Sequence, residues 1–269
     1  MTELCELAEK YYVDKCPKFH HYYTPEYHKI LNNKQYKSML EIGIGYPELM
    51  RKYTHANYKS GASLYMWRDY FKDCTIHGAD IKEFTINEKN IVIHRCDQSK
   101  RESLQNMIKN IGNVDFIIDD GSHILEHQVI TFLTLNKYCN DTYIIEDVLI
   151  QNLDTIAALN NEEWKSFTYK HENDHQGFVC FQRVKQELPP IFYINLDKRT
   201  DRKEHIEKLL NNYNYDHERF PAILDERGYI GCVKSHIQCL KLAKERNYEN
   251  VIILEDDFIF LENSNFDNL

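Results

Sequence analysis

The sequence has no uncharged apolar run near the roughly 18 residues that a membrane-spanning helix needs. Its opening residues, MTELCELAEKYY, are acidic, whereas a secretory signal begins with a basic segment followed by an apolar one. We therefore expect a soluble, cytoplasmic protein without a membrane span.

Cysteine pairs typical of metal or disulfide frameworks are also missing. The eight cysteines include no CxxC and no Cys/His cluster at zinc-finger spacing. A chain of 269 residues is too large to need disulfide staples. We expect buried, reduced thiols.

Positive charge is in deficit, since 33 Lys and Arg stand against 42 Asp and Glu, for a net charge of −9. No basic patch stands out against that background, which argues against a general binder of nucleic acid or anionic membrane. Neutral or cationic small ligands fit better. Hydrophobic residues at 42% and charged residues at 28% are ordinary for a globular chain of one to two domains.

Short β-type runs alternate with helical patterns over about the first 150 residues. The runs are 38–44, 75–81, 90–95, 114–119 and 142–148. This alternation predicts a mostly parallel sheet with helices on both faces. Several runs end in carboxylates or glycine, at the sheet edge where α/β proteins bind ligands.

A second unit is predicted beyond a polar stretch, 186–190, that ends in two prolines and serves as a linker. Two further strands, 166–170 and 178–184, complete the first domain, 1–185. The second domain, 191–269, is expected to contain strand 191–196, helices 202–212 and 234–246, and strand 250–256. It resembles the opening of a larger α/β domain, and its uncovered apolar surface should favour self-association into a homo-oligomer or docking onto the first domain.

The first strand runs into a glycine turn, Glu41-Ile42-Gly43-Ile44-Gly45, where backbone can approach a ligand closely. Tyr46 follows in place of a further small residue, so the dinucleotide fingerprint is incomplete and NAD is disfavoured. Asp80 ends the next strand, from which a carboxylate can accept both hydroxyls of a ribose. Asp97 and Gln98 end the third strand and support the same cofactor site.

Three carboxylates, Asp120, Glu146 and Asp147, are predicted at the ends of neighbouring strands, and they cannot crowd together without a cation. Oxygen ligands favour Mg²⁺, which can bind two adjacent sugar hydroxyls and acidify one. His123 could then remove the proton as general base. The alternative is that His123 is a surface residue and that Ser122 caps a helix beginning at His123.

About the first 150 residues resemble the metal-dependent macrolide-sugar O-methyltransferases, which are class I S-adenosylmethionine enzymes with a Rossmann-like sheet. The resemblance implies a glycan or sugar acceptor, Asp120, Glu146 and Asp147 as metal ligands, and a set of cofactor-site residues. The matching motifs are Asp14-Lys15 to His21, Tyr23-Thr24-Pro25, Tyr27, Leu40-Glu41-Ile42-Gly43, Gly61-Ala62-Ser63-Leu64, Trp67, Gly78 to Ile81, Asp97-Gln98-Ser99, Ile118-Asp119-Asp120-Gly121-Ser122-His123 and Ile145-Glu146-Asp147. The implied cofactor-site residues are Glu41, Asp80, Asp97, Gln98 and Asp119, with Ser63 and Trp67 close by. Cys96, where such enzymes often have glycine, departs from the pattern.

The second unit resembles the family 25 glycosyltransferases of lipopolysaccharide and collagen modification. The matching motifs are Phe192 to Asp197, Arg199, Asp201, Arg202, Arg219 to Ala222, Gly231-Cys232, Ser235-His236 and Leu254 to Asp257. The resemblance implies a partial GT-A type fold for a uridine diphosphate sugar, with Arg199 and Arg202 near the diphosphate. The acidic cluster Glu255-Asp256-Asp257 would hold Mn²⁺ or Mg²⁺. The family continues into an acceptor-binding half, so we expect no sugar transfer from this chain alone.

These features together predict a sugar O-methyltransferase that uses S-adenosylmethionine and Mg²⁺, followed by part of a family 25 glycosyltransferase. One alternative is a longer glycosyltransferase with the methyltransferase as a tailoring module. A second is a non-catalytic glycan-binding or assembly module.

Overall fold

A computed structural model describes residues 2–172, 175–184, 188–213 and 215–261. The chain divides into two compact units, Met1–Val184 and Lys185–Leu269. Residues 186 and 187 of the predicted linker lie outside the described residues.

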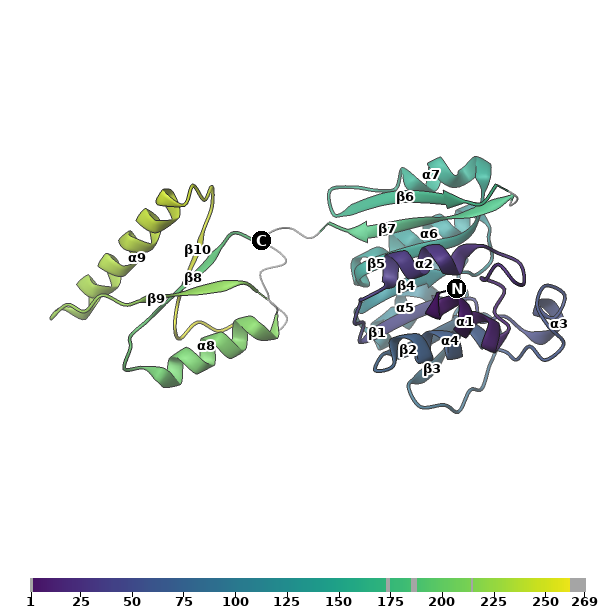
Figure 1. The fold of residues 1–269 in the computed structure, drawn as a ribbon, viewed down its shortest axis with the longest axis horizontal. Helices are drawn as coiled ribbons and strands as arrows, with labels where there is room; N and C mark the ends of the chain where they lie inside the picture. Colours follow the sequence, from purple (N-terminus) through teal and green to yellow (C-terminus); the bar gives the residue numbers. More distant parts are fainter. Residues whose placement is uncertain (1, 173–174, 185–187, 214, 262–269) are drawn as a thin grey trace. The chain divides into compact units, whose positions relative to one another are not determined.

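The first unit is built on a seven-stranded sheet with the order β3-β2-β1-β4-β5-β7-β6 (Figure 1). Strands β1 to β5 run parallel, whereas β7 pairs antiparallel with both β5 and β6. The bounds are β1 Ser38–Ile42, β2 Thr75–Asp80, β3 Ile91–Arg95, β4 Val114–Asp119, β5 Cys139–Leu149, β6 Trp164–Lys170 and β7 Gln176–Arg183. The predicted mostly parallel α/β sheet is therefore present.

Helices cover both faces of this sheet. Helices α1, α2 and α4 share a hydrophobic core on one face, and α5, α6 and α7 share a second core on the other. The bounds are α1 Glu3–Tyr11, α2 Tyr23–Leu31, α3 Pro47–Met50, α4 Ala62–Phe71, α5 Arg101–Ile111, α6 Leu125–Leu135 and α7 Leu153–Ala157, with 3-10 turns η1 Asn136–Tyr138 and η2 Ile150–Asn152.

The pleat of β1 decides which way its functional carboxylate points. Met39 packs in the core shared with α1, α2 and α4, and Leu40 packs in the opposite core. Side chains alternate along a strand, so Glu41 points to the same face as Met39. Glu41 is fully buried there, on the face of the sheet that α1 covers.

The second unit contains a three-stranded parallel sheet with the order β10-β8-β9. The bounds are β8 Ile191–Asn195, β9 His217–Pro221, β10 Ile252–Glu255, α8 Thr200–Asn212 and α9 Gly228–Glu245. Two small cores flank β8, one beside α8 and one beside α9. The second unit is thus also α/β.

The strands predicted from the sequence are all present, and their ends differ from the predicted ends by at most three residues. The largest difference is in β5, which begins at Cys139 and not at position 142. Strand β9 was not predicted, because its polar sequence HERFP lacks the apolar content of a buried strand. Helix α9 begins at Gly228, earlier than the predicted start at position 234. The alternative role of Ser122 as cap of a helix starting at His123 is wrong, since α6 begins at Leu125.

Seven of the eight cysteines are buried, and Cys232 is partly exposed; none forms a disulfide. The expected burial is thereby confirmed for all but Cys232. No helix among the described residues combines the length and the apolar character that crossing a membrane requires.

Candidate active site

The candidate site lies where β1, β4 and β5 end at their carboxyl edge. Asp120 follows β4 directly, and its backbone N–H donates to the Ile42 carbonyl at the end of β1, at 2.8 Å. Glu146 and Asp147 lie in β5, where the register of β5 with β7 is interrupted. Because β4 pairs with both β1 and β5, the carboxylates from the three strands meet.

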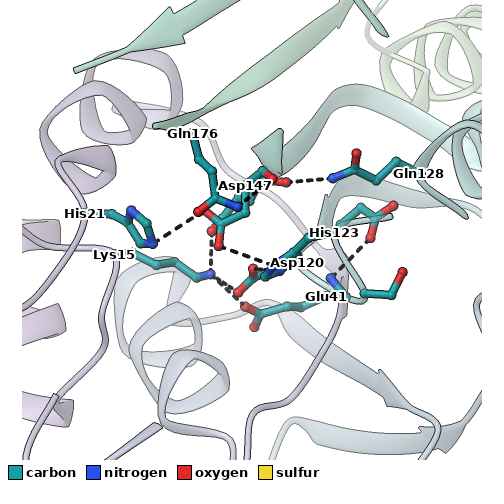
Figure 2. Close-up of polar contacts among 12 residues, drawn as sticks. Lys15, His21, Glu41, Asp120, His123, Gln128, Asp147 and Gln176 are labelled. Carbon is teal, nitrogen blue, oxygen red and sulfur yellow. Dashed lines mark hydrogen bonds and ion pairs between the residues drawn. The ribbon is translucent and has the colours of Figure 1, made fainter. Parts of the chain in front are cut away.

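A buried lysine sits among these carboxylates (Figure 2). The Lys15 side chain is only 2% exposed, and its Nζ is 2.7 Å from Glu146 Oε2 and 3.8 Å from Glu41 Oε1. It also donates to Asp120 Oδ2. Burial alone would lower the pKa of Lys15, but the charges of Asp120, Glu146 and Glu41 raise it well above its usual value. The sequence alone indicates no role for Lys15, which belongs to the motif Asp14-Lys15 to His21.

His123 bridges two of the acids. Its Nε2 is 3.1 Å from Asp120 Oδ1 and its Nδ1 is 3.7 Å from Asp147 Oδ2. Both His123 and Asp147 have positive φ, 57° and 51°, a backbone conformation that costs energy for non-glycine residues and often occurs at functional sites. Burial would lower the pKa of His123, but the hydrogen bond and charge of Asp120, and then the charge of Asp147, raise it to about 9.

Asp147 is further held by a ring of polar contacts. The Tyr23 hydroxyl donates to Asp147 Oδ1 at 2.8 Å, and His21 Nε2 lies 3.5 Å from the same oxygen. The Gln176 amide donates to the Asp147 carbonyl at 3.1 Å. Contacts from α2, from the loop before it and from β7 thus fix the orientation of Asp147. Figure 2 shows His21 and Gln176 beside Asp147.

Several buried acceptors in the site have no hydrogen bond within the described part of the chain. They are both carboxylate oxygens of Glu41, Asp119 Oδ2 and Glu146 Oε1. Burial raises the pKa of Glu41 to about 7 against the opposing charge of Lys15, and raises the pKa of Asp119 to about 7. Buried acceptors without donors are costly, so a cation or a ligand with N–H or O–H donors suits this site.

The structure brings together a donor set for a metal ion. Asp120, His123 and Asp147 offer ligand atoms that lie within 4.8 Å of one another. Glu146, the third predicted ligand, instead pairs through one oxygen with Lys15 and keeps its other oxygen without a hydrogen-bond partner among the described residues. Oxygen-rich ligand sets suit Mg²⁺, so the residues fit such an ion.

Next to this cluster, the turn after β1 faces the end of β2. Asp80 Oδ2 accepts from the Ile44 backbone N–H at 3.0 Å, and its Oδ1 accepts from the Lys82 N–H at 2.9 Å. Gly43 has φ of 92°, and a Cβ added there would lie 2.0 Å from the Asp120 carbonyl oxygen. Only glycine fits at this position, and it lets the end of β1 approach the end of β4 closely.

The two residues predicted at the end of β3 face different partners. Asp97 turns into its own loop, accepting from the Ser99 hydroxyl at 2.6 Å and pairing with Lys100 at 2.8 Å. Gln98 reaches back to the site, donating to Asp119 Oδ1 at 2.5 Å and accepting from the Ser122 N–H at 2.9 Å. The structure therefore joins Gln98, rather than Asp97, to the carboxylate cluster.

Ser63 and Trp67 lie on α4. Ser63 is in the first turn and is buried. Trp67 is fully buried, with its ring stacked on Phe71 and edge-on to Phe116. The structure thus places Trp67 in the hydrophobic core, where it packs against other rings.

The predicted second-unit residues gather around a cavity of about 200 Å³, which Arg199, Arg202, Glu255 and Asp256 help to line. Arg202 pairs with Asp256 at 3.0 Å and with Asp257 at 2.8 Å. Asp256 also accepts from the Asn195 amide at 2.8 Å, whereas Arg199 pairs with Asp201 at 2.7 Å. The two aspartates therefore share one arginine as their ion-pair partner.

The fold and the strand-end site together define a chain with an α/β unit of the class I methyltransferase type. Residues of this chain are 33% identical over 151 residues to the mycinamicin VI 2''-O-methyltransferase of Micromonospora griseorubida, covering 54% of this chain and 36% of that protein. They are also 33% identical over 153 residues to the demethylmacrocin O-methyltransferase of Streptomyces fradiae, covering 54% and 36%. The chain spans little more than a third of the length of these curated relatives.

A solved structure supports the same likeness. The MycE methyltransferase from the mycinamycin biosynthetic pathway, in complex with Mg and SAH, matches with a TM-score of 0.54 and 25% identity, over 70% of this chain and 56% of that chain. The family model described as "Glycosyltransferase family 25 (LPS biosynthesis protein)" matches residues 224–268. A glycosyltransferase 25 family member of Drosophila melanogaster is 29% identical over 107 residues, covering 29% of this chain and 18% of that protein. Both resemblances seen in the sequence are thereby confirmed: a region similar to macrolide-sugar O-methyltransferases precedes a short family 25 segment.

Proposed function

We propose that the first unit is an O-methyltransferase that transfers a methyl group from S-adenosylmethionine to a sugar hydroxyl with the help of Mg²⁺. The observation that carries this proposal is the convergence of Asp120, His123 and Asp147 at the carboxyl edge of the sheet. Glu146 lies beside them and keeps a buried oxygen without a partner among the described residues. The similarity to sugar O-methyltransferases supports the same chemistry.

In this proposal Asp120, Glu146 and Asp147 hold the metal, which, when bound, lowers the pKa of a coordinated sugar hydroxyl. His123 would accept the hydroxyl proton at a ring nitrogen, since it directly contacts Asp120, one of the proposed metal ligands. In the metal-free protein the carboxylates of Asp120 and Asp147 favour the protonated form of the His123 ring. A cation held by those carboxylates opposes that preference, because nearby positive charge disfavours a charged imidazole.

On the cofactor side, Asp80 accepts from ribose hydroxyls, and Glu41, Gly43, Gln98 and Asp119 line the remaining surface. Among the described residues, no group donates a hydrogen bond to the Glu41 oxygens or to Asp119 Oδ2, which supports this assignment because these oxygens can accept N–H or O–H groups of the cofactor. Asp97, Ser63 and Trp67 are proposed to lie around the cofactor site. The acceptor is a sugar or glycan, by analogy with a relative of Streptomyces olivaceus whose name specifies a rhamnosyl tetracenomycin-C.

The test is to titrate S-adenosylmethionine into the protein with and without Mg²⁺, and then to incubate labelled cofactor with a library of glycans and glycosylated polyketides. We expect cofactor binding with or without Mg²⁺ and methylated sugar only with it. Asp120→Asn removes a charge from one of the proposed metal ligands. Its matched control is Asp154→Asn, because Asp154 is an exposed carboxylate on α7. Absence of cofactor binding by the folded chain would favour a non-catalytic glycan-binding or assembly module instead.

We further infer that the second unit is the nucleotide side of a family 25 glycosyltransferase of partial GT-A type. The cavity with Arg199 and Arg202 supports this inference, since guanidinium groups suit a diphosphate. Calorimetry with a uridine diphosphate sugar and Mn²⁺ or Mg²⁺ should detect weak binding. Arg202→Ala removes one of the two guanidinium groups from the cavity and should therefore weaken that binding, and unchanged affinity would contradict the inference.

A further inference from the structure

A second cluster of metal-type ligands lies in the second unit, away from the two aspartates expected there. Cys232 and His236 are four residues apart on α9, which places both side chains on one face of the helix. Glu255 is the last residue of β10. Their ligand atoms lie within 4.8 Å of one another.

The distances in this cluster match the edges of a tetrahedral site. Cys232 Sγ is 3.3 Å from Glu255 Oε1 and 3.7 Å from His236 Nδ1. With metal–sulfur bonds of about 2.3 Å and metal–nitrogen or metal–oxygen bonds of about 2.0 Å, tetrahedral geometry puts sulfur about 3.5 Å from each of the other ligands. Little movement is therefore needed to receive an ion.

The ligand types select the ion. Thiolate and imidazole suit Zn²⁺, whereas Mg²⁺ prefers an all-oxygen set. The neighbouring Asp256 and Asp257 are both paired with Arg202, so Glu255 is the acid of the triplet that faces the cysteine. We propose that Cys232, His236 and Glu255 bind a zinc ion.

The surroundings of each ligand are compatible with coordination. Burial and Glu255 raise the pKa of Cys232, so the thiol keeps its proton in the metal-free protein and can donate it to Glu255. Coordination replaces that proton, which leaves to solvent, with a sulfur–zinc bond. His236 Nδ1, the ring nitrogen that lies 3.7 Å from the thiol, is also 3.1 Å from the Cys232 carbonyl oxygen, and coordination through Nδ1 replaces that contact.

Three protein ligands leave a fourth tetrahedral position open, as in zinc sites that bind water or substrate. Cys232 and Glu255 also line the cavity of about 200 Å³ that contains Arg199 and Arg202. A zinc ion bound by these ligands would therefore add positive charge to a cavity that is already lined by the guanidinium groups of Arg199 and Arg202. An anionic group is the ligand class that this combination suits.

The experiment uses the full chain in millimolar Mg²⁺, the ion proposed above for the oxygen-rich site of the first unit. Cobalt(II) is added as a spectroscopic substitute for zinc, and zinc affinity is measured by competition with a chromophoric chelator. A bond between cobalt and thiolate gives a charge-transfer band in the near ultraviolet. The first-unit cluster of Asp120, His123 and Asp147 contains no cysteine, so the band reports the second unit.

We expect the band in the wild type, its loss in Cys232→Ser, and at least tenfold weaker zinc binding in His236→Gln and Glu255→Gln. Cys239→Ser, a buried cysteine on the same helix, is the matched control and should keep the band. Absence of the band in the wild type, or its persistence in Cys232→Ser, would overturn the proposal. Should a cysteine variant fail to fold, Glu255→Gln decides, because Glu255 is exposed and its substitution leaves the core intact.

Discussion

Lys15 Nζ lies 2.7 Å from Glu146 Oε2, although the two residues are 131 positions apart in the chain. This buried ion pair connects the segment after α1 with the edge of β5, and the same ammonium group contacts Glu41 and Asp120. One internal cation therefore links a carboxylate on the proposed cofactor side to two on the proposed metal side. Lys15 keeps these acids together when no divalent ion is bound.

Replacing Lys15 by Met should destabilise the metal-free protein by about 3 to 5 kcal/mol, because it leaves buried carboxylates without their cation. Urea unfolding with and without Mg²⁺ measures the effect, and Mg²⁺ should restore part of the stability. Lys29→Met is the control, since Lys29 is 68% exposed in its pair with Glu26. Equal midpoints for wild type and Lys15→Met would show that the ion pair contributes nothing.

The sequence predicted the strands and the acids at their ends because both leave local signals. Apolar runs that stop at a carboxylate identify Asp119 and Asp120, and neighbouring parallel strands bring such ends together. Lys15 leaves no such signal: its burial arises from contacts with residues distant in sequence. The turn of Gln98 toward Asp119 depends in the same way on the packing of two strand ends.

Methyl transfer should require a divalent cation held by Asp120, Glu146 and Asp147. Excess EDTA should abolish turnover and Mg²⁺ should restore it, while cofactor binding survives because the ribose contacts do not involve the metal. Turnover and calorimetric affinity are measured on the same sample. Full activity in EDTA would rule out the metal role.

His123→Ala should lower the methyl-transfer rate by about 10²- to 10⁴-fold while metal binding persists, as expected for loss of a general base. His127→Ala, one helical turn further on, removes only a contact with the Ser122 hydroxyl and serves as the control. Single-turnover kinetics and metal titration separate the two effects. Loss of folding or of metal in His123→Ala would point to a structural role.

Asp80→Ala should weaken binding of S-adenosylmethionine by about tenfold to more than a hundredfold, because charge-assisted hydrogen bonds contribute roughly 1.5 to 3 kcal/mol. Asp80 also accepts from the Ile44 and Lys82 backbone, so Asp80→Asn is measured in parallel with thermal stability. Unchanged affinity in the alanine variant would remove Asp80 from the cofactor site.

Two histidines on neighbouring strands should make stability depend on pH. His77 Nδ1 is 2.9 Å from His94 Nε2, between β2 and β3. Burial, and then His94, lowers the pKa of His77 from 6.5 to about 4, and burial lowers the pKa of His94. Both rings are therefore neutral in the folded protein at pH values where they are protonated in the unfolded chain.

Because the unfolded chain binds more protons in this range, the stability contributed by the pair is present above about pH 6.5 and is lost as pH falls toward about 4. The free energy of unfolding is measured with urea at about pH 7.5 and about pH 5. Its decrease between the two pH values should be smaller in His77→Gln than in the wild type by on the order of 1 kcal/mol, a value discounted because the rings are partly exposed. The difference between wild type and variant isolates this pair from the buried acids, whose raised pKa values act in the opposite direction. An identical pH dependence in the two proteins would mean that the histidines stay solvated.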